Sequence, residues 1–208
     1  MSFRSVCSVA VVMSVVSGAA MLGGCETTKE KQLAVTRSSA AELRTQLSEM
    51  SPQVDKTMAA MDAVLLGKGN SKDLIKSFSN EIGKLQSQAN VVRHEADSAI
   101  SDADGYFAAW SKELANAKQI ESRDAGAAKM ELTRANFNSF QSDLAGAKTD
   151  YNRFLGNLTD VKLAMEKNPG AALSPDVQRY SSDAVVNAAN VKNRVNALLS
   201  RINGFLGK

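Results

Sequence analysis

The side chain best suited to covalent chemistry is the thiol of Cys25, which stands at the end of an apolar N-terminal segment. Arg4 supplies a positive start, residues 6–21 form the apolar stretch, and two glycines come directly before the cysteine. This stretch is too short to span a bilayer comfortably, and its flanks are typical of a secretory signal that is cleaved. The sequence therefore predicts that residues 1–24 are a signal peptide.

The four residues at the predicted cleavage site, Leu22-Gly23-Gly24-Cys25, resemble the lipobox of bacterial lipoproteins. The resemblance implies that the Cys25 thiol is alkylated with diacylglycerol, that a peptidase cuts just before it, and that its new amino group is often acylated too. Each buried methylene contributes about 0.8 kcal/mol and one chain holds a protein only marginally, so two or three chains give a durable membrane anchor. Glu26 follows, where enterobacterial lipoproteins retained in the inner membrane carry Asp, and this implies the outer membrane by the same resemblance.

Two other interpretations of the N-terminus stay open. Cys25 could be an ordinary thiol after an ordinary signal, or residues 6–22 could be an uncleaved membrane anchor. The only other cysteine, Cys7, lies within the predicted signal. A mature chain acylated on Cys25 would therefore have no thiol for a disulfide, a redox centre or a cysteine nucleophile.

Elsewhere, the side chains capable of chemistry lack suitable partners in the sequence. His94 is the only histidine, and without a second His or a Cys it forms no metal-ligand pattern, so we expect an exposed surface residue. Residues 102–105, Asp-Ala-Asp-Gly, are similar to the opening of a calcium loop, but the remaining ligands and the closing Glu are absent, which predicts a solvated helix face. The sequence contains no nucleophile elbow, P-loop or dinucleotide fingerprint. We therefore predict a protein that is not an enzyme and has no cofactor.

Composition limits the remaining classes. Cleavage before Cys25 leaves 184 of the 208 residues, enough for one domain with a substantial core. Of the 25 Lys and Arg only Arg4 is removed, so 24 remain against 22 Asp and Glu. The charges alternate along the chain without a basic run or interleaved aromatic residues, and this pattern excludes a typical nucleic-acid-binding surface.

Four segments of the mature chain carry apolar residues at alternating spacings of three and four, which is typical of helices packed as coiled coils. Gly67-Lys68-Gly69-Asn70 ends the first segment, and Ser51-Pro52 predicts a kink within it or two helices nearly in line. The predicted core positions of the first two segments are Leu33, Ala40, Leu43, Leu47, Met50, Val54, Met61 and Val64, and Phe78, Ile82, Leu85, Ala89, Val92, Ala96, Ala99, Ala103, Tyr106 and Trp110. Those of the last two are Phe137, Phe140, Leu144, Ala147, Tyr151, Phe154, Leu158, Val161 and Met165, and Val177, Ala184, Ala188, Val191, Val195, Leu198 and Ile202.

Local signals place the ends of these helices. Ser71 is the predicted N-cap of the second helix, and a turn is predicted at residues 120–124. Asn168-Pro169-Gly170 ends the third helix, and Ser174 followed by Pro175 opens the fourth. No strand pattern occurs. We predict an all-α fold, an elongated antiparallel bundle of three to four long helices over residues 32–208, preceded by a lipidated tether at residues 25–31.

Three aromatic residues, Tyr106, Phe107 and Trp110, lie near the end of the second predicted helix. If the chain reverses soon afterwards, Phe137 and Phe140 return to the same level and the rings cluster as core. Because Phe107 is out of phase with the other core positions, the alternative is an exposed patch that binds a partner or lipid.

A second resemblance rests on Phe107-x-x-Trp110-x-x-Glu113-Leu114, in a long helix followed by a polar turn and another long helix. This arrangement is similar to a bacterial domain-of-unknown-function family of coiled-coil-rich proteins, many of them predicted lipoproteins. The resemblance covers roughly residues 73–165. It implies a helical fold and a location in the cell envelope, but no activity.

Together these patterns predict a lipoprotein anchored in the bacterial outer membrane and facing the periplasm, where it acts as a non-enzymatic structural or protein-interaction module with a partner in the envelope. One alternative is a covalent peptidoglycan tether through the C-terminal Lys208, as in the small major outer-membrane lipoprotein of enteric bacteria. Another is a protein that binds a lipid or small ligand between its helices. A large apolar pocket between the second and third helices would favour the ligand binder.

Overall fold

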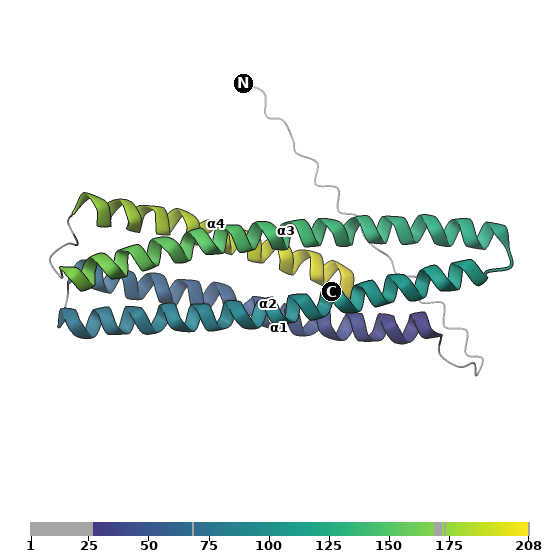
Figure 1. The fold of residues 1–208 in the computed structure, drawn as a ribbon, viewed down its shortest axis with the longest axis horizontal. Helices are drawn as coiled ribbons and strands as arrows, with labels where there is room; N and C mark the ends of the chain where they lie inside the picture. Colours follow the sequence, from purple (N-terminus) through teal and green to yellow (C-terminus); the bar gives the residue numbers. More distant parts are fainter. Residues whose placement is uncertain (1–26, 68, 169–171, 173, 208) are drawn as a thin grey trace, which may run out of the picture.

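The protein is a bundle of four long helices in a computed structural model, which describes residues 27–67, 69–168, 172 and 174–207 (Figure 1). The helices are α1 (Thr28–Leu66), α2 (Ser71–Asn116), α3 (Ile120–Lys167) and α4 (Pro175–Leu206). No strand occurs within the described residues. The predicted all-α bundle of long helices is confirmed. Cys25 and Lys208 lie outside the described residues.

The helix ends agree with most of the local sequence signals. Gly67 closes α1 with a φ of 61°, the left-handed conformation that glycine adopts without strain. Ser174 caps α4 with its side chain and Pro175 is the first helical residue, as predicted. The N-cap of α2 is Asn70, whose side chain accepts from the Lys72 amide, so the prediction of Ser71 was wrong by one residue.

Two other boundaries differ from the predictions, and one of the two alternatives at Pro52 is excluded. The connection between α2 and α3 is residues 117–119, earlier than the turn predicted at 120–124. α1 is one continuous helix through Pro52, and not two helices in line. It begins at Thr28, so the last four residues of the predicted tether, 28–31, are helical. The helix starts early because its N-cap, Thr27, has a capping partner three residues further on.

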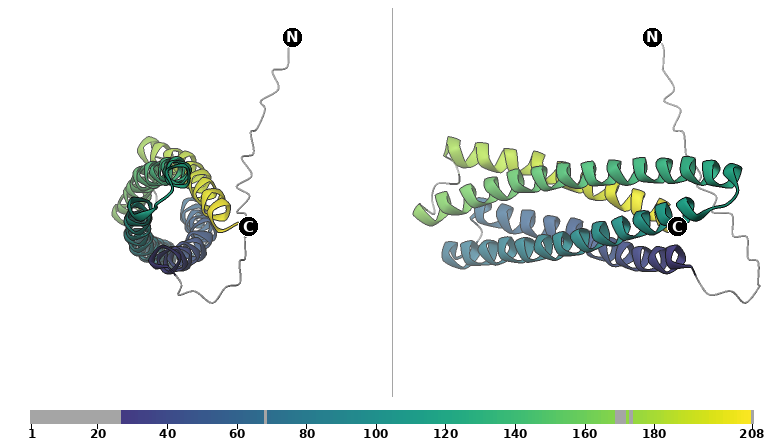
Figure 2. Two further views of the ribbon diagram at one scale, coloured as in Figure 1. Left: turned by 90° about the vertical axis from the view of Figure 1, so that its right-hand side faces the viewer. Right: turned by 45° about the vertical axis from the view of Figure 1, so that its right-hand side comes forward.

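The four helices run alternately up and down, and each packs against its neighbours in the chain, while α4 also packs against α1 to close the ring (Figure 2). α1 packs most extensively on α2, and α3 on α4. Two ion pairs one heptad apart fix the register of α3 and α4: Arg194 with Asp150 and Arg201 with Asp143. Lys192 of α4 pairs with Asp55 of α1, with 2.8 Å between Nζ and Oδ1.

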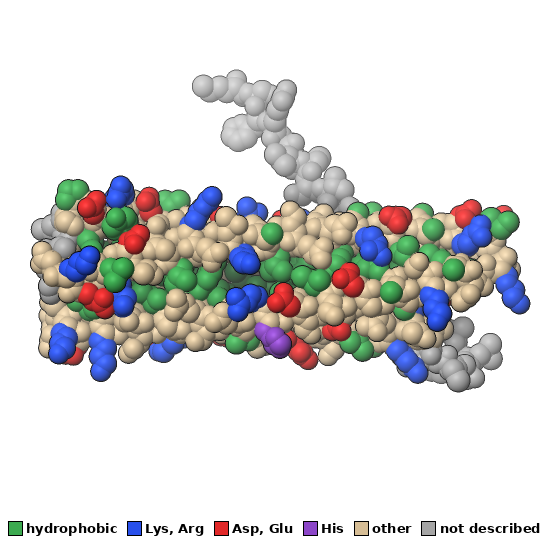
Figure 3. Space-filling view, viewed as in Figure 1, with side chains coloured by type: hydrophobic (Ala, Val, Ile, Leu, Met, Phe, Trp, Pro, Cys, Tyr) green, Lys and Arg blue, Asp and Glu red, His purple; other side chains and the backbone are tan. Residues whose placement is uncertain are grey.

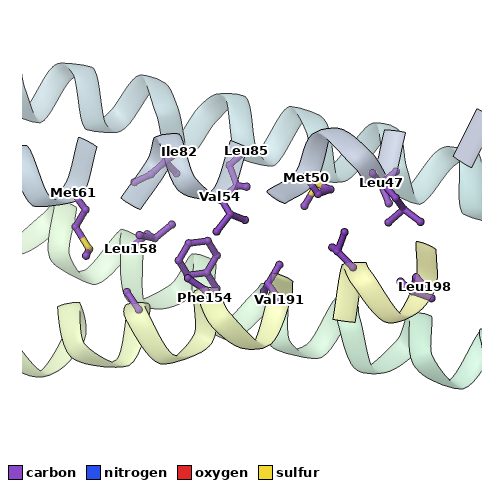
Figure 4. Close-up of a cluster of buried hydrophobic side chains, with 14 of the residues drawn as sticks. Leu47, Met50, Val54, Met61, Ile82, Leu85, Phe154, Leu158, Val191 and Leu198 are labelled. Carbon is purple, nitrogen blue, oxygen red and sulfur yellow. The ribbon is translucent and has the colours of Figure 1, made fainter. Parts of the chain in front are cut away.

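The main core fills the middle of the bundle with aliphatic and methionine side chains from all four helices, together with Phe78, Phe140 and Phe154 (Figure 4). Nearly every predicted core position is buried. The exceptions, which are only partly buried, are Leu33, Ala89, Phe137, Leu144, Ala147 and Tyr151. Most of them belong to α3, where it packs less extensively against α2, and apolar side chains are visible along this seam in Figure 3.

Unequal helix lengths leave one end of the bundle without its fourth helix. α3 has 48 residues and α4 has 32, which at 1.5 Å per residue correspond to about 72 Å and 48 Å. α4 therefore stops short of the end at which α1 begins and α2 meets α3 (Figure 1). A second, smaller core fills this three-helix end, built from Ala103, Tyr106, Phe107 and Trp110 with Leu33, Leu114, Met130 and Phe137 packed against them.

Candidate functional site

Thr27, the N-cap of α1, is the described residue nearest to Cys25 in the sequence. The Thr27 Oγ1 accepts a hydrogen bond from the Glu30 amide at 3.2 Å, and the Thr27 amide donates to the Glu30 carboxylate at 2.9 Å. These two bonds form a reciprocal capping box. The bond from the Thr27 backbone holds the pKa of the Glu30 carboxyl below its usual value. The N-cap of α1 therefore lies only two residues after Cys25.

The first turns of α1 are held against α2 by polar contacts. Lys29 Nζ lies 2.6 Å from Glu113 Oε1 and 5.6 Å from the centre of the Trp110 ring. Further along, the Gln32 side-chain amide donates to the Asp102 backbone carbonyl oxygen at 3.3 Å. The Thr36 hydroxyl lies 3.0 Å from the same oxygen. These contacts join the first turns of α1 to the second half of α2.

The aromatic residues predicted as a possible exposed patch are buried in the smaller core. Tyr106, Phe107 and Trp110 expose 8%, 2% and 6% of their surface. The Tyr106 ring centre lies 5.6 Å from that of Phe107 and 5.4 Å from that of Trp110. Burial raises the pKa of the Tyr106 phenol above its ordinary value. The patch alternative was therefore wrong, because the rings are not available to a partner.

Phe107 is covered although it is out of phase with the other core positions of α2. Its ring centre lies 5.7 Å from that of Phe137 on α3, which in turn lies 6.2 Å from that of Phe140. The Arg134 guanidinium lies 4.4 Å from the centre of the Phe107 ring and covers it. The expectation that these rings cluster with Phe137 and Phe140 is confirmed.

The residues singled out for metal chemistry lie on the helical surface. His94 is exposed on α2, as predicted. Asp102 and Asp104 belong to the continuous helix α2 and not to a loop, which confirms the helical part of the prediction. Of residues 102–105 only Asp104 is exposed, and Ala103 lies in the smaller core. Among the residues that the structure describes, no three His, Cys, Asp or Glu side chains form a group that could hold a metal ion.

Two surface hollows lie at the end of the bundle opposite the smaller core. One, of about 450 Å³, lies between the start of α2 and the end of α3 and is lined by Lys72, Ile75, Lys76, Ser79, Asn80 and Glu166. The other, of about 270 Å³, is lined by Met61, Asp62, Leu65, Gln178, Ser181, Ser182 and Val185 of α1 and α4. The larger hollow is open to solvent, and three of the six residues around it are charged.

Buried hydroxyl groups mark two places of incomplete hydrogen bonding. The Tyr151 hydroxyl and the Ser51 hydroxyl are buried and have no hydrogen-bond partner among the described residues. Burial raises the pKa of the Tyr151 phenol to about 12. Among the described residues, no His or carboxylate is hydrogen-bonded to either hydroxyl.

Sequence patterns did not reveal the polar contacts that join α1 to α2. Thr36, Ser39 and Thr57 are buried at core spacing among small residues. The Gln53 side chain donates to Glu81 and the Gln88 side chain donates to the Gln46 carbonyl oxygen. The available signal was the phase of the threonines, which occupy core positions that an apolar residue would usually hold.

No protein-family model, curated protein or solved structure matches this chain. Among the described helices, none has an apolar stretch that could cross a bilayer. The fold defines the class of the protein as an elongated all-α bundle of four helices.

Proposed function

We propose that the mature protein begins at Cys25, is acylated there, and is held by its lipid in the outer membrane of a bacterium, facing the periplasm. The observation that carries this proposal is the position of the lipobox-like Leu22-Gly23-Gly24-Cys25, three residues before the capped start of α1. The Thr27–Glu30 capping box places the N-cap of the helical bundle two residues after Cys25.

We infer that the bundle itself is a non-enzymatic structural or protein-interaction module of the cell envelope. It is about 70 Å long along α3, so it offers long helical faces to a partner. The two hollows described above are shallow and open to solvent. Long helical faces with interspersed charges suit a partner that docks along the rod, and an envelope protein is the partner we expect.

The test of the anchor compares the two cysteines of the precursor. Cys25→Ala should block processing, leave a longer precursor and abolish incorporation of labelled fatty acid. Cys7→Ala is the matched control, since it removes a thiol from the predicted signal and should leave processing and acylation unchanged. Normal acylation of the Cys25→Ala protein would overturn the proposal.

The test of the module is crosslinking in living cells followed by purification of the lipidated protein. A reproducible crosslink from an exposed helical position to one envelope protein supports the interaction module. Surface positions for a photoreactive residue are available at Val91 and Leu163, which expose 40% and 45% of their surface. An absence of protein crosslinks from every exposed helical face would contradict it.

A further inference from the structure

The start of α1 and the connection between α2 and α3 lie at the same end of the bundle (Figure 1). The Lys29–Glu113 ion pair places the first turn of α1 level with Glu113. α2 continues from there to Asn116, which at 1.5 Å per residue adds about 5 Å, and the connection at residues 117–119 follows. The connection therefore projects past the start of α1.

The length of chain before α1 limits how far this end can be from a lipid held on Cys25. Thr28 is the third residue after Cys25, with two residues between them. A fully extended chain covers at most about 3.6 Å per residue, so the Cα of Cys25 lies within about 11 Å of that of Thr28. An anchor on such a short tether holds the projecting connection at the level of the lipid headgroups when the long axis of the bundle stands upright.

The connection presents an apolar side chain at this end. Ile120, the first residue of α3, exposes 66% of its surface. The exposed charged residues around it are Lys118, Glu121, Arg123 and Asp124, two of each sign. The connection itself therefore carries no net charge, and the favourable interaction of Ile120 with a bilayer would be apolar.

We propose that the α2–α3 connection is a second membrane contact, in which Ile120 enters the headgroup layer and the bundle stands with this end on the bilayer. The inference rests on the proposed acylation of Cys25. The occupant of the surface is the phospholipid layer in which the anchor lies. The opposite end, with the α1–α2 and α3–α4 connections, then projects about 60 Å away from the membrane, since α1 has 39 residues.

The test uses acylated full-length protein purified from membranes and reconstituted in phosphatidylcholine vesicles. A fluorophore sensitive to its environment is attached to Ile120→Cys. Leu66→Cys is the matched control, since Leu66 exposes 65% of its surface and lies at the opposite end of the bundle. The expected result is a shift of emission to shorter wavelength, and quenching by a spin label on the lipid headgroup, at residue 120 and not at residue 66.

Equal quenching at both positions would mean that the bundle lies flat and would overturn the inference. So would an absence of quenching at residue 120. A signal at residue 120 that requires anionic lipid would contradict apolar insertion.

Mass spectrometry of Cys25 and flotation with the vesicles separate this inference from the proposed function. A protein without acyl chains overturns both. A protein that is acylated and floats, but whose residue 120 remains in water, overturns only the second contact.

Discussion

The rings of Phe107 on α2 and Phe137 on α3 pack with their centres 5.7 Å apart at the end of the bundle that α4 does not reach. Phe107 exposes only 2% of its surface. Phe107→Ala should therefore lower the free energy of unfolding by roughly 3 to 5 kcal/mol, as expected for a large buried ring. Denaturant unfolding followed by circular dichroism measures the change.

Leu132→Ala is the control for this prediction. Leu132 lies on α3 in the same part of the bundle but exposes 60% of its surface. Its truncation should change the free energy of unfolding by less than about 0.5 kcal/mol. Similar small effects of both substitutions would mean that the smaller core contributes little to stability.

Leucines on α3 provide a second prediction within one helix. Leu158 is fully buried and Leu144 only partly. Leu158→Ala should cost roughly 2 to 4 kcal/mol, and Leu144→Ala less than about 2 kcal/mol, because less of its surface leaves water on folding. Leu85→Ala on α2 should behave like Leu158→Ala.

The exposed positions Gln86 and Lys148 control for helix propensity, since both can be replaced with Ala without opening a cavity. Thermal unfolding of the five variants ranks them. If the two buried leucines cost no more than the exposed positions, the helices do not pack as described, and another chain would have to complete the core.

The partial burial of Leu144 and the full burial of Phe107 show where sequence patterns reached their limit. Heptad spacing predicts which face of each helix is apolar, and it located four helices and most of the main core. It does not specify how closely two helices approach. α3 packs more extensively on α4 than on α2, so its apolar face is only partly covered between Phe137 and Tyr151.

The burial of Phe107 depends on how the helices pack, which helical spacing alone does not give. Neighbouring residues in a helix point about 100° apart, so Tyr106 and Phe107 cannot both face one seam. Both are buried because α2 lies between α1 and α3 at this end, and Arg134 covers the Phe107 ring from α3. The register of α2 against α3, which follows from the three-residue connection, decides this and has no signature in the sequence.

The Tyr151 hydroxyl gives a prediction for pH dependence. Burial raises the pKa of this phenol in the folded protein to about 12, from an ordinary value of 10.0. Above pH 10 the unfolded chain releases the proton while the folded protein keeps it, so stability falls as the pH rises from about 10 to about 12. Tyr151→Phe should make this loss smaller. It will not remove the loss, because burial also raises the pKa of Tyr106.

At neutral pH the same variant tests the missing hydrogen bond. The Tyr151 hydroxyl has no partner among the described residues, so replacing Tyr with Phe removes a desolvated polar group and keeps the ring. Stability at pH 7 should stay equal or rise by up to about 1 kcal/mol. A loss larger than about 1 kcal/mol would show that the hydroxyl has a bound partner, such as a water molecule.

The end of α4 bears on whether the protein is a peptidoglycan tether. Arg44 Nε donates to Asn203 Oδ1 at 2.7 Å, which places the last turn of α4 level with Arg44. Arg44 is 16 residues, or about 24 Å, from the start of α1 at Thr28. α4 thus ends beside the N-terminal half of α1 and not at either end of the bundle. With the anchor at the start of α1, the last described turn of α4 does not reach the end of the bundle that is far from the membrane.

We therefore predict that deleting Lys208 leaves the location and phenotype of the protein unchanged, and that His94→Ala, a change at an exposed site, is equally silent. Boiling cell walls in detergent and probing the washed peptidoglycan for the protein measures covalent attachment. The wild-type protein should be released completely. If wild-type protein stays bound and the Lys208 deletion frees it, the protein is a tether, because the deletion removes the side-chain amine that would form the crosslink. If His94→Ala abolishes function while the protein remains folded and acylated, His94 takes part in that function, either in contact with the partner or in chemistry.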